Sequence, residues 1–117
     1  MKEADYENTL VAAATLLGWQ VHVERTSRTK DGWATAIKGH AGWPDFFAIH
    51  PGRKQLLIVE LKRKPNKPTD AQLRWLSCFR ALGLACGVAW VPEDMPLLLA
   101  VLAGERFAPW ELPSEPS

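Results

Sequence analysis

The spacing of hydrophobic and polar residues changes along the chain, and each spacing predicts one kind of element. Apolar side chains recur at the helical period in residues 3–17 and again in residues 70–82, which predicts two amphipathic helices. Residues 19–25 alternate between apolar and polar side chains, as in a half-buried strand. Residues 84–91 form a mixed apolar run and are expected to be a buried strand, followed by a short helix or loop over residues 92–102.

The strongest pattern lies between residues 42 and 62, where two apolar runs flank a Pro-Gly turn signal. This arrangement predicts a β-hairpin. If the turn is a loop of about four residues, His50 pairs with Gln55, and counting back along the strands places Asp45 opposite Glu60. A slip of one residue would put these two carboxylates on opposite faces, so the predicted site depends on this register.

Asp45, Glu60 and Lys62 are the candidate chemical residues of this hairpin. Directly opposed residues share a face, with Cβ atoms about 5 Å apart. Two carboxylates at this distance repel each other, but a divalent cation between them reverses the sign of the interaction. Lys62 lies two residues past Glu60 and points to the same face. Each residue alone also suits a solvated strand end with a cross-strand ion pair, but a lone Glu60 would be costly in a strand apolar on both faces.

At these residues the chain resembles a known family. Asp45, followed after a gap by Glu-Leu-Lys at 60–62, resembles the signature of the PD-(D/E)XK nucleases. Gly-Trp-Pro-Asp at 42–45, with the later Gln72 and Trp75, is similar to the virus-type replication-repair nuclease (VRR-NUC) branch. The predicted elements have the order α-β-β-β-α-β. The resemblance implies the same α/β fold, a restriction-endonuclease-like core with a mixed sheet flanked by helices.

The resemblance also implies a role for each residue of the hairpin site. Asp45 and Glu60 would bind Mg²⁺ or Mn²⁺ together with the backbone carbonyl of Leu61, and Lys62 would position or deprotonate the attacking water. The bound cation would polarise the scissile phosphate and activate that water. The products would be a 5′-phosphate and a 3′-hydroxyl, and no organic cofactor is expected.

Further candidate site residues lie on the two predicted helices. Glu7 falls at the edge of the apolar stripe of the first helix, which suits either an exposed rim charge or a site residue. The resemblance favours a site residue that reaches the metal directly or through a water, with Glu3 as the alternative carboxylate one turn earlier. Gln72 has the spacing of a capping box with Thr69. In the family the matching Gln lies near the active site, and the two roles are compatible.

The distribution of charge favours a partner that carries phosphates. The net charge of the whole chain is +1, but residues 25–67 hold ten of the fourteen Lys and Arg residues and three of the thirteen acids. A basic region therefore surrounds the candidate site. Residues 26–41 are expected to form a long polar loop, and Trp33 within it or Trp43 after it would stack on an unpaired base or pack against the sheet. The candidate DNA-binding residues are Arg28, Lys30, Lys38, Arg63, Lys64, Lys67, Trp33 and Trp43.

The remaining features limit the class of protein. Residues 1–112 are expected to form one domain, with a frayed tail at 113–117. No apolar run approaches the roughly 20 residues of a membrane span, and the acidic N-terminus does not resemble a signal peptide. Cys78 and Cys86 are too few for a disulfide framework. We therefore expect both cysteines to be reduced and the protein to be cytoplasmic, as in a bacterial or phage-infected cell.

Three functions are compatible with these features. The first is a metal-dependent, structure-specific DNA endonuclease, such as a Holliday-junction resolvase or flap nuclease. It would act as a homodimer on branched DNA, because symmetric cutting of two strands needs two active sites. The second is a nuclease that acts on other DNA or on RNA. The third, a non-catalytic DNA-binding module, is less favoured because Asp45, Glu60 and Lys62 are all present.

Overall fold

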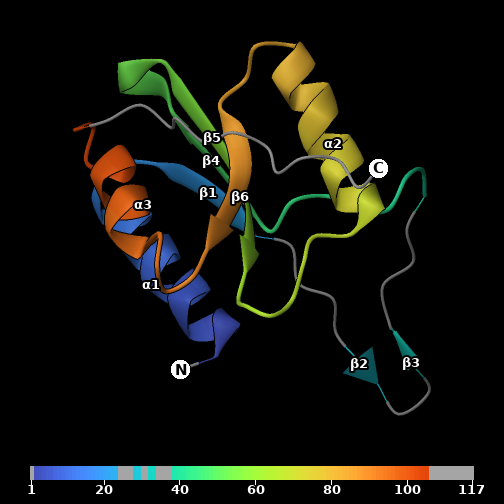
Figure 1. Cartoon of the computed structure of the whole chain (residues 1–117). Helices are drawn as coiled ribbons and strands as arrows, with labels where there is room; N and C mark the ends of the chain where they lie inside the picture. The colour runs from blue at the N-terminus through green and yellow to red at the C-terminus, as the bar shows by residue number, and fades with distance from the viewer. Residues whose placement is uncertain (1, 24–27, 30–31, 34–37, 106–117) are drawn as a thin grey trace.

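The computed structural model describes residues 2–23, 28–29, 32–33 and 38–105 (Figure 1). Four strands form one mixed sheet in the order β1-β4-β5-β6. β4 is antiparallel to both β1 and β5, whereas β6 is parallel to β5. The strands are β1 (Gln20–Val23), β4 (Phe46–His50), β5 (Gln55–Lys62) and β6 (Cys86–Trp90).

Helices cover both faces of this sheet (Figure 1). α1 (Glu3–Leu16) and α3 (Met95–Leu102) pack together against one face, and α2 (Asp70–Ala81) covers the other. A short 3-10 turn, η1 (Pro51–Arg53), joins β4 to β5. The predicted α/β fold with a mixed sheet flanked by helices is thus confirmed. Each helix in the described part of the chain is too short or too polar to span a membrane.

The predicted loop over residues 26–41 is wrong in part. β2 (Arg28–Thr29) and β3 (Gly32–Trp33) form an antiparallel pair that is separate from the main sheet. Strands this short contain no run of alternating side chains, so the sequence pattern gave no sign of them. The other predicted elements are present, with ends that differ by at most four residues. The expected tail at residues 113–117 lies outside the described residues.

Alternation along β5 separates two hydrophobic cores and fixes the direction of Glu60. Leu57, Val59 and Leu61 are fully buried on the side of α1 and α3, whereas Ile58 packs with the residues of α2. Because successive side chains point to opposite faces, Glu60 lies on the α2 face with Ile58. Burial on both faces explains the nearly continuous apolar sequence of β5, and it makes a carboxylate in this strand unusual.

The β4–β5 hairpin has the predicted register. His50 pairs with Gln55, and the ladder ends where Asp45 precedes β4 beside Glu60. The turn is closed locally, because Nδ1 of His50 accepts a hydrogen bond from the backbone N–H of Arg53 at 3.1 Å. This closure holds the register, and the register places the two carboxylates at the same end of the hairpin.

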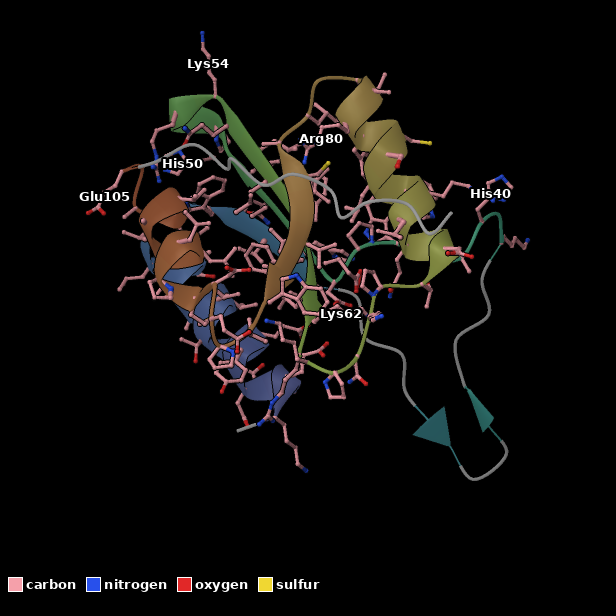
Figure 2. All side chains as sticks on the ribbon, in the orientation of Figure 1. His40, His50, Lys54, Lys62, Arg80 and Glu105 are labelled. Carbon is pink, nitrogen blue, oxygen red and sulfur yellow. The ribbon has the colours of Figure 1, made fainter. Side chains whose placement is uncertain are left out.

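The opposite end of the molecule is held by a group that we call the Arg53 anchor, formed by Arg53, Trp19 and Leu102. The Trp19 Nε1–H and the Arg53 Nη2–H both donate to the backbone carbonyl of Leu102, at 2.8 and 2.7 Å. The Arg53 guanidinium also lies 5.3 Å from the centroid of the Trp19 ring. Figure 2 shows His50 at this end of the sheet and Lys62 at the other.

Candidate active site

The candidate site lies where β5 ends and β4 begins. Asp45 immediately precedes β4, and its Oδ2 accepts a hydrogen bond from the backbone N–H of Leu61 at 3.2 Å. Lys62 is the last residue of β5, and its Nζ is 3.9 Å from Oε1 of Glu60. The carboxyl ends of parallel strands such as β5 and β6 are a common place for binding sites in α/β proteins. The fold therefore brings the three residues of the sequence signature to one edge of the sheet.

Glu60 is buried beneath this edge, with 1% of its side chain exposed. Its Oε1 accepts a hydrogen bond from Nε2 of Gln72 at 3.1 Å, whereas its Oε2 is buried without a hydrogen-bond partner among the described residues. Burial and the neighbouring Asp45 raise the pKa of Glu60 to about 10, although Lys62 acts in the opposite direction. A proton or a cation beside Oε2 would relieve both the desolvation and the repulsion between the carboxylates.

Gln72 connects this buried carboxylate to the first turn of α2. The Thr69 Oγ1 accepts a hydrogen bond from the Gln72 backbone N–H at 3.2 Å, and Oε1 of Gln72 accepts one from the Thr69 N–H at 2.9 Å. The predicted capping box is thus confirmed. Nε2 of the same side chain donates to Glu60, so Gln72 both caps the helix and contacts the buried carboxylate of the candidate site.

The two α1 carboxylates considered from the sequence differ in their relation to this site. Burial and the charge of Asp45 raise the pKa of Glu3, while Lys62 lowers it, so Glu3 lies within electrostatic reach of the site. Glu3 also contributes to the raised pKa of Glu60. Glu7 lies one turn further along α1 and is buried, with 9% of the residue exposed. A role for Glu7 at the metal stays a prediction.

Comparison with known structures identifies the architecture around these residues. A solved structure described as a VRR_NUC domain matches this chain with a TM-score of 0.61 and 26% sequence identity, over 83% of this chain and 92% of the other. The chain has the VRR-NUC fold. The resemblance to the VRR-NUC branch of the PD-(D/E)XK superfamily stated from the motifs is confirmed, and the match points to a nuclease in general. No protein-family model and no curated protein matches the sequence.

Nucleases of the PD-(D/E)XK superfamily generally use divalent metal ions, so the question is whether the residues of the candidate site fit such an ion. Within the described ranges, no three His, Cys, Asp or Glu side chains are grouped so as to hold an ion on their own. Asp45 and Glu60 nevertheless fit a hard cation, because two carboxylates lie together and the buried Oε2 of Glu60 has no partner in the described part of the chain. A ligand role for the Leu61 carbonyl stays a prediction.

Basic residues continue the chain directly from the VRR-NUC site. The candidate DNA-binding Lys and Arg residues whose side chains are described are all exposed, and Arg63 and Lys64 follow β5 without a gap. Their contact with DNA stays a prediction. The exposed members of this set are Lys38, Arg63, Lys64 and Lys67. The side chains that lie outside the described part of the chain are those of Arg28, Lys30 and Trp33.

Trp43 packs into an aromatic cluster on the α2 side of the sheet. The centroid of its ring lies 5.1 Å from that of Trp75, 5.6 Å from that of Phe79 and 6.1 Å from that of Phe47. Trp43 keeps 37% of its surface exposed. Packing, the alternative considered from the sequence, is therefore an observed role of Trp43, while stacking on a base stays a prediction.

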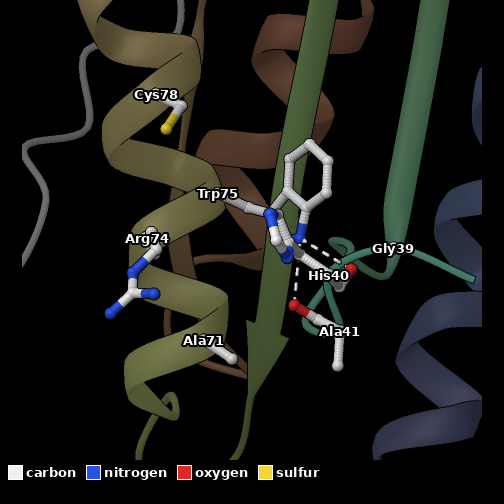
Figure 3. Close-up of a pocket in the computed structure, with 7 residues that line it drawn as sticks. All are labelled: Gly39, His40, Ala41, Ala71, Arg74, Trp75 and Cys78. Atoms are coloured by element: carbon white, nitrogen blue, oxygen red, sulfur yellow. Dashed lines mark hydrogen bonds between the residues drawn. The ribbon is translucent and has the colours of Figure 1, made fainter.

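Trp75 has a contact that the sequence did not predict. Its indole Nε1–H donates to the backbone carbonyls of His40 and Ala41, at 3.3 and 3.0 Å (Figure 3). Any residue supplies a backbone carbonyl, so the sequence carries no signal for these partners. The contact holds the segment that leads into Asp45 against α2.

Proposed function

We propose that this protein is a metal-dependent, structure-specific DNA endonuclease that hydrolyses phosphodiester bonds. The observation that carries the proposal is the buried carboxylate of Glu60, held beside Asp45 and Lys62 at one edge of a VRR-NUC fold. A buried carboxylate next to a second one destabilises the fold unless a positive charge is supplied. A site with this cost is more readily explained by chemistry than by stability.

The proposed mechanism assigns separate tasks to the residues around the phosphate. Asp45 and Glu60 would hold one Mg²⁺ or Mn²⁺, which when bound would polarise the scissile phosphate and lower the pKa of an attacking water. Lys62 would orient that water and stabilise the negative charge that develops on the phosphate oxygens. Gln72 would keep Glu60 in its orientation through the 3.1 Å hydrogen bond.

For the carboxylate from α1 we propose Glu7, which is buried and which the family resemblance favours, or Glu3 one turn earlier. The support for Glu3 is electrostatic, because Glu3 interacts with Asp45, Glu60 and Lys62. Glu3 would add negative charge at the outer side of the ion, directly or through a water. Glu7 would support the site from one turn further along the helix.

The proposed substrate is branched DNA, a four-way junction or a flap, and the proposed active form is a homodimer. The support is the basic region that continues from β5, which suits contacts along more than one DNA backbone. Two copies are needed to cut two strands symmetrically, because one chain holds one such site.

The first test is cleavage of labelled junction, flap, duplex and single-stranded DNA and of RNA, with Mg²⁺, with Mn²⁺ and with EDTA. We expect cleavage of branched DNA with metal, and losses of at least about a hundredfold for Asp45→Asn and for Lys62→Gln. Lys54→Gln is the matched control, because it removes the same charge from an exposed residue at the other end of the hairpin. Binding without cleavage would favour the DNA-binding module, and cleavage of RNA alone would reassign the substrate.

A second pair of variants separates the two roles of Gln72. Thr69→Ala and Gln72→Ala each remove half of the capping box and should each lower the free energy of unfolding by about 1 kcal/mol. Only Gln72→Ala also removes the partner of Glu60 Oε1. We therefore expect Gln72→Ala alone to reduce kcat. Equal turnover in both variants would show that Gln72 is only a helix cap.

A further inference from the structure

A cavity of about 340 Å³ lies beside the candidate active site, between the segment at residues 39–41 and one side of α2 (Figure 3). The helix contributes Ala71, Arg74, Trp75 and Cys78 to its lining. Pockets that receive small organic ligands begin at about 300 Å³, so this one is large enough for a single nucleobase with part of its sugar.

The cavity is built by fixed contacts. The Trp75 indole N–H donates to the backbone carbonyls of His40 and Ala41, and these hydrogen bonds orient the wall of the cavity formed by residues 39–41. Gly42 then passes so close to α2 that a Cβ on it would lie 2.6 Å from the carbonyl carbon of Ala71. Both contacts hold this segment against α2, and the cavity is the space that remains between the segment and the helix.

Both walls of the cavity lead directly into the candidate active site. On the helix side, Ala71 lines the cavity and the next residue, Gln72, donates to Glu60. On the loop side, the chain runs from Ala41 through a fully buried Pro44 to Asp45. The cavity wall is therefore one residue from Gln72, which contacts Glu60, and four residues from Asp45 along the chain.

The lining has the chemistry of a nucleobase site and lacks that of a phosphate site. Trp75 supplies an aromatic wall, and Ala71 and Cys78 supply small, weakly polar surface. Arg74 is exposed at the cavity and carries the positive charge of the lining, which holds no acidic residue among those that the structure describes. A bare phosphate would need several convergent donors, but the Trp75 N–H is already used by backbone carbonyls.

From these contacts we infer that the cavity receives an unpaired base of the nucleic-acid substrate, while Arg74 pairs with the adjoining phosphate. The inference rests on the proposed nuclease function and makes it more specific. Single-stranded nucleic acid is commonly bound by aromatic and apolar surface for the base with Arg or Lys for the backbone. The consequence is a preference for cleavage next to an unpaired nucleotide.

The two cysteines allow a test that does not depend on cleavage. Cys78 lines the cavity and is exposed, whereas Cys86 is buried and serves as the internal control. In EDTA, saturating DNA with an unpaired arm should slow alkylation of Cys78 by about tenfold, consistent with the energy of one stacked base. With the same DNA carrying abasic nucleotides in the arm, the alkylation rate of Cys78 should stay near that of the free protein. Equal protection by both DNAs, or protection by neither, would overturn the inference.

Cleavage supplies the complementary test. Cys78→Trp should fill the cavity, and Ala81→Trp adds the same side chain at an exposed position of α2 outside it. We expect Cys78→Trp, but not Ala81→Trp, to lose about tenfold in kcat/KM on a flap with unpaired bases. On the abasic flap, Cys78→Trp and the native chain should have the same kcat/KM. If Cys78→Trp cuts every substrate like the native chain, the cavity proposal fails. If the native chain cuts no nucleic acid, the nuclease proposal fails instead.

Discussion

At the residue scale, Glu60 combines two unfavourable conditions. Its side chain is almost completely buried, and Asp45 lies beside it. One carboxylate oxygen is satisfied by Gln72, and the other has no partner among the described residues. Without a cation, the carboxyl group is therefore more stable protonated, which is the physical meaning of its raised pKa.

This raised pKa predicts a particular dependence of stability on pH in EDTA. The pKa of Glu60 rises from 4.5 to about 10 on folding, so between these values the folded chain holds a proton that the unfolded chain has lost. The stabilising contribution is complete below about pH 4.5 and is lost as the pH rises, by at most about 1.4 kcal/mol per pH unit. Urea unfolding of the native chain and of Glu60→Gln at pH 5 and pH 8 measures it.

Glu60→Gln is the informative variant because its amide resembles the protonated acid and does not titrate. We expect Glu60→Gln to be the more stable protein at pH 8, with the difference between the two proteins shrinking toward pH 5. Groups that do not interact with Glu60 titrate equally in both chains, so they cancel in the difference, and what remains comes from Glu60 and the charges coupled to it. An unchanged difference across this range would show that Glu60 is ionised in the metal-free fold.

At the element scale, the start of α2 organises both the candidate site and the neighbouring cavity. Its capping box presents Gln72 to Glu60, and Trp75, one turn later, binds the backbone of His40 and Ala41. The first turn of a helix can position such side chains well, because the cap fixes the backbone of that turn. The segment that carries Asp45 is therefore positioned by α2 as well as by its own hairpin.

The close approach of Gly42 to α2 predicts the effect of one methyl group. Gly42 has φ +100° and Gly39 has φ +94°, so Ala at either position carries a backbone cost. At Gly42 the Cβ would also lie 2.6 Å from Ala71, while at Gly39 no atom of the described residues lies within 4 Å. Gly42→Ala should lower the free energy of unfolding by about 1–3 kcal/mol more than Gly39→Ala. Urea unfolding checks this, and equal losses would show that the segment is not docked as described.

At the scale of the whole molecule, the two ends of the sheet have different tasks. The candidate site occupies the carboxyl end of β5, where a buried carboxyl group beside Asp45, with one oxygen unpartnered among the described residues, reduces stability. The Arg53 anchor at the other end joins the hairpin turn to the end of α3 and to Trp19. Stability is thus supplied away from the residues proposed for chemistry.

This separation predicts that the anchor can be weakened without loss of catalysis. Arg53→Met removes the 2.7 Å hydrogen bond to Leu102 but also a buried Nη1 that has no partner among the described residues. The net loss in unfolding free energy should therefore be modest, about 1–2 kcal/mol. We expect kcat on branched DNA to be unchanged well below the melting temperature. A fall in kcat with the fold intact would show that the two ends are coupled.

Features that depend on neighbouring residues along the chain could be predicted from the amino-acid pattern alone. The hairpin register follows from the turn at residues 51–54 and the alternation on either side of it, and the Thr69–Gln72 cap follows from spacing alone. Together with the signature residues, these local features were enough to predict the fold, because each is set by backbone geometry over a few residues.

Contacts between groups far apart in the chain, by contrast, became visible only in the folded molecule. The bond from Gln72 to Glu60, the electrostatic link of Glu3 to Asp45 and the cavity at Trp75 each depend on how a helix packs on the sheet. A change in the position or rotation of a helix alters all of these contacts while leaving its hydrophobic period intact. Contacts between elements are therefore set by side-chain packing across the sheet, which the spacing of residues does not encode.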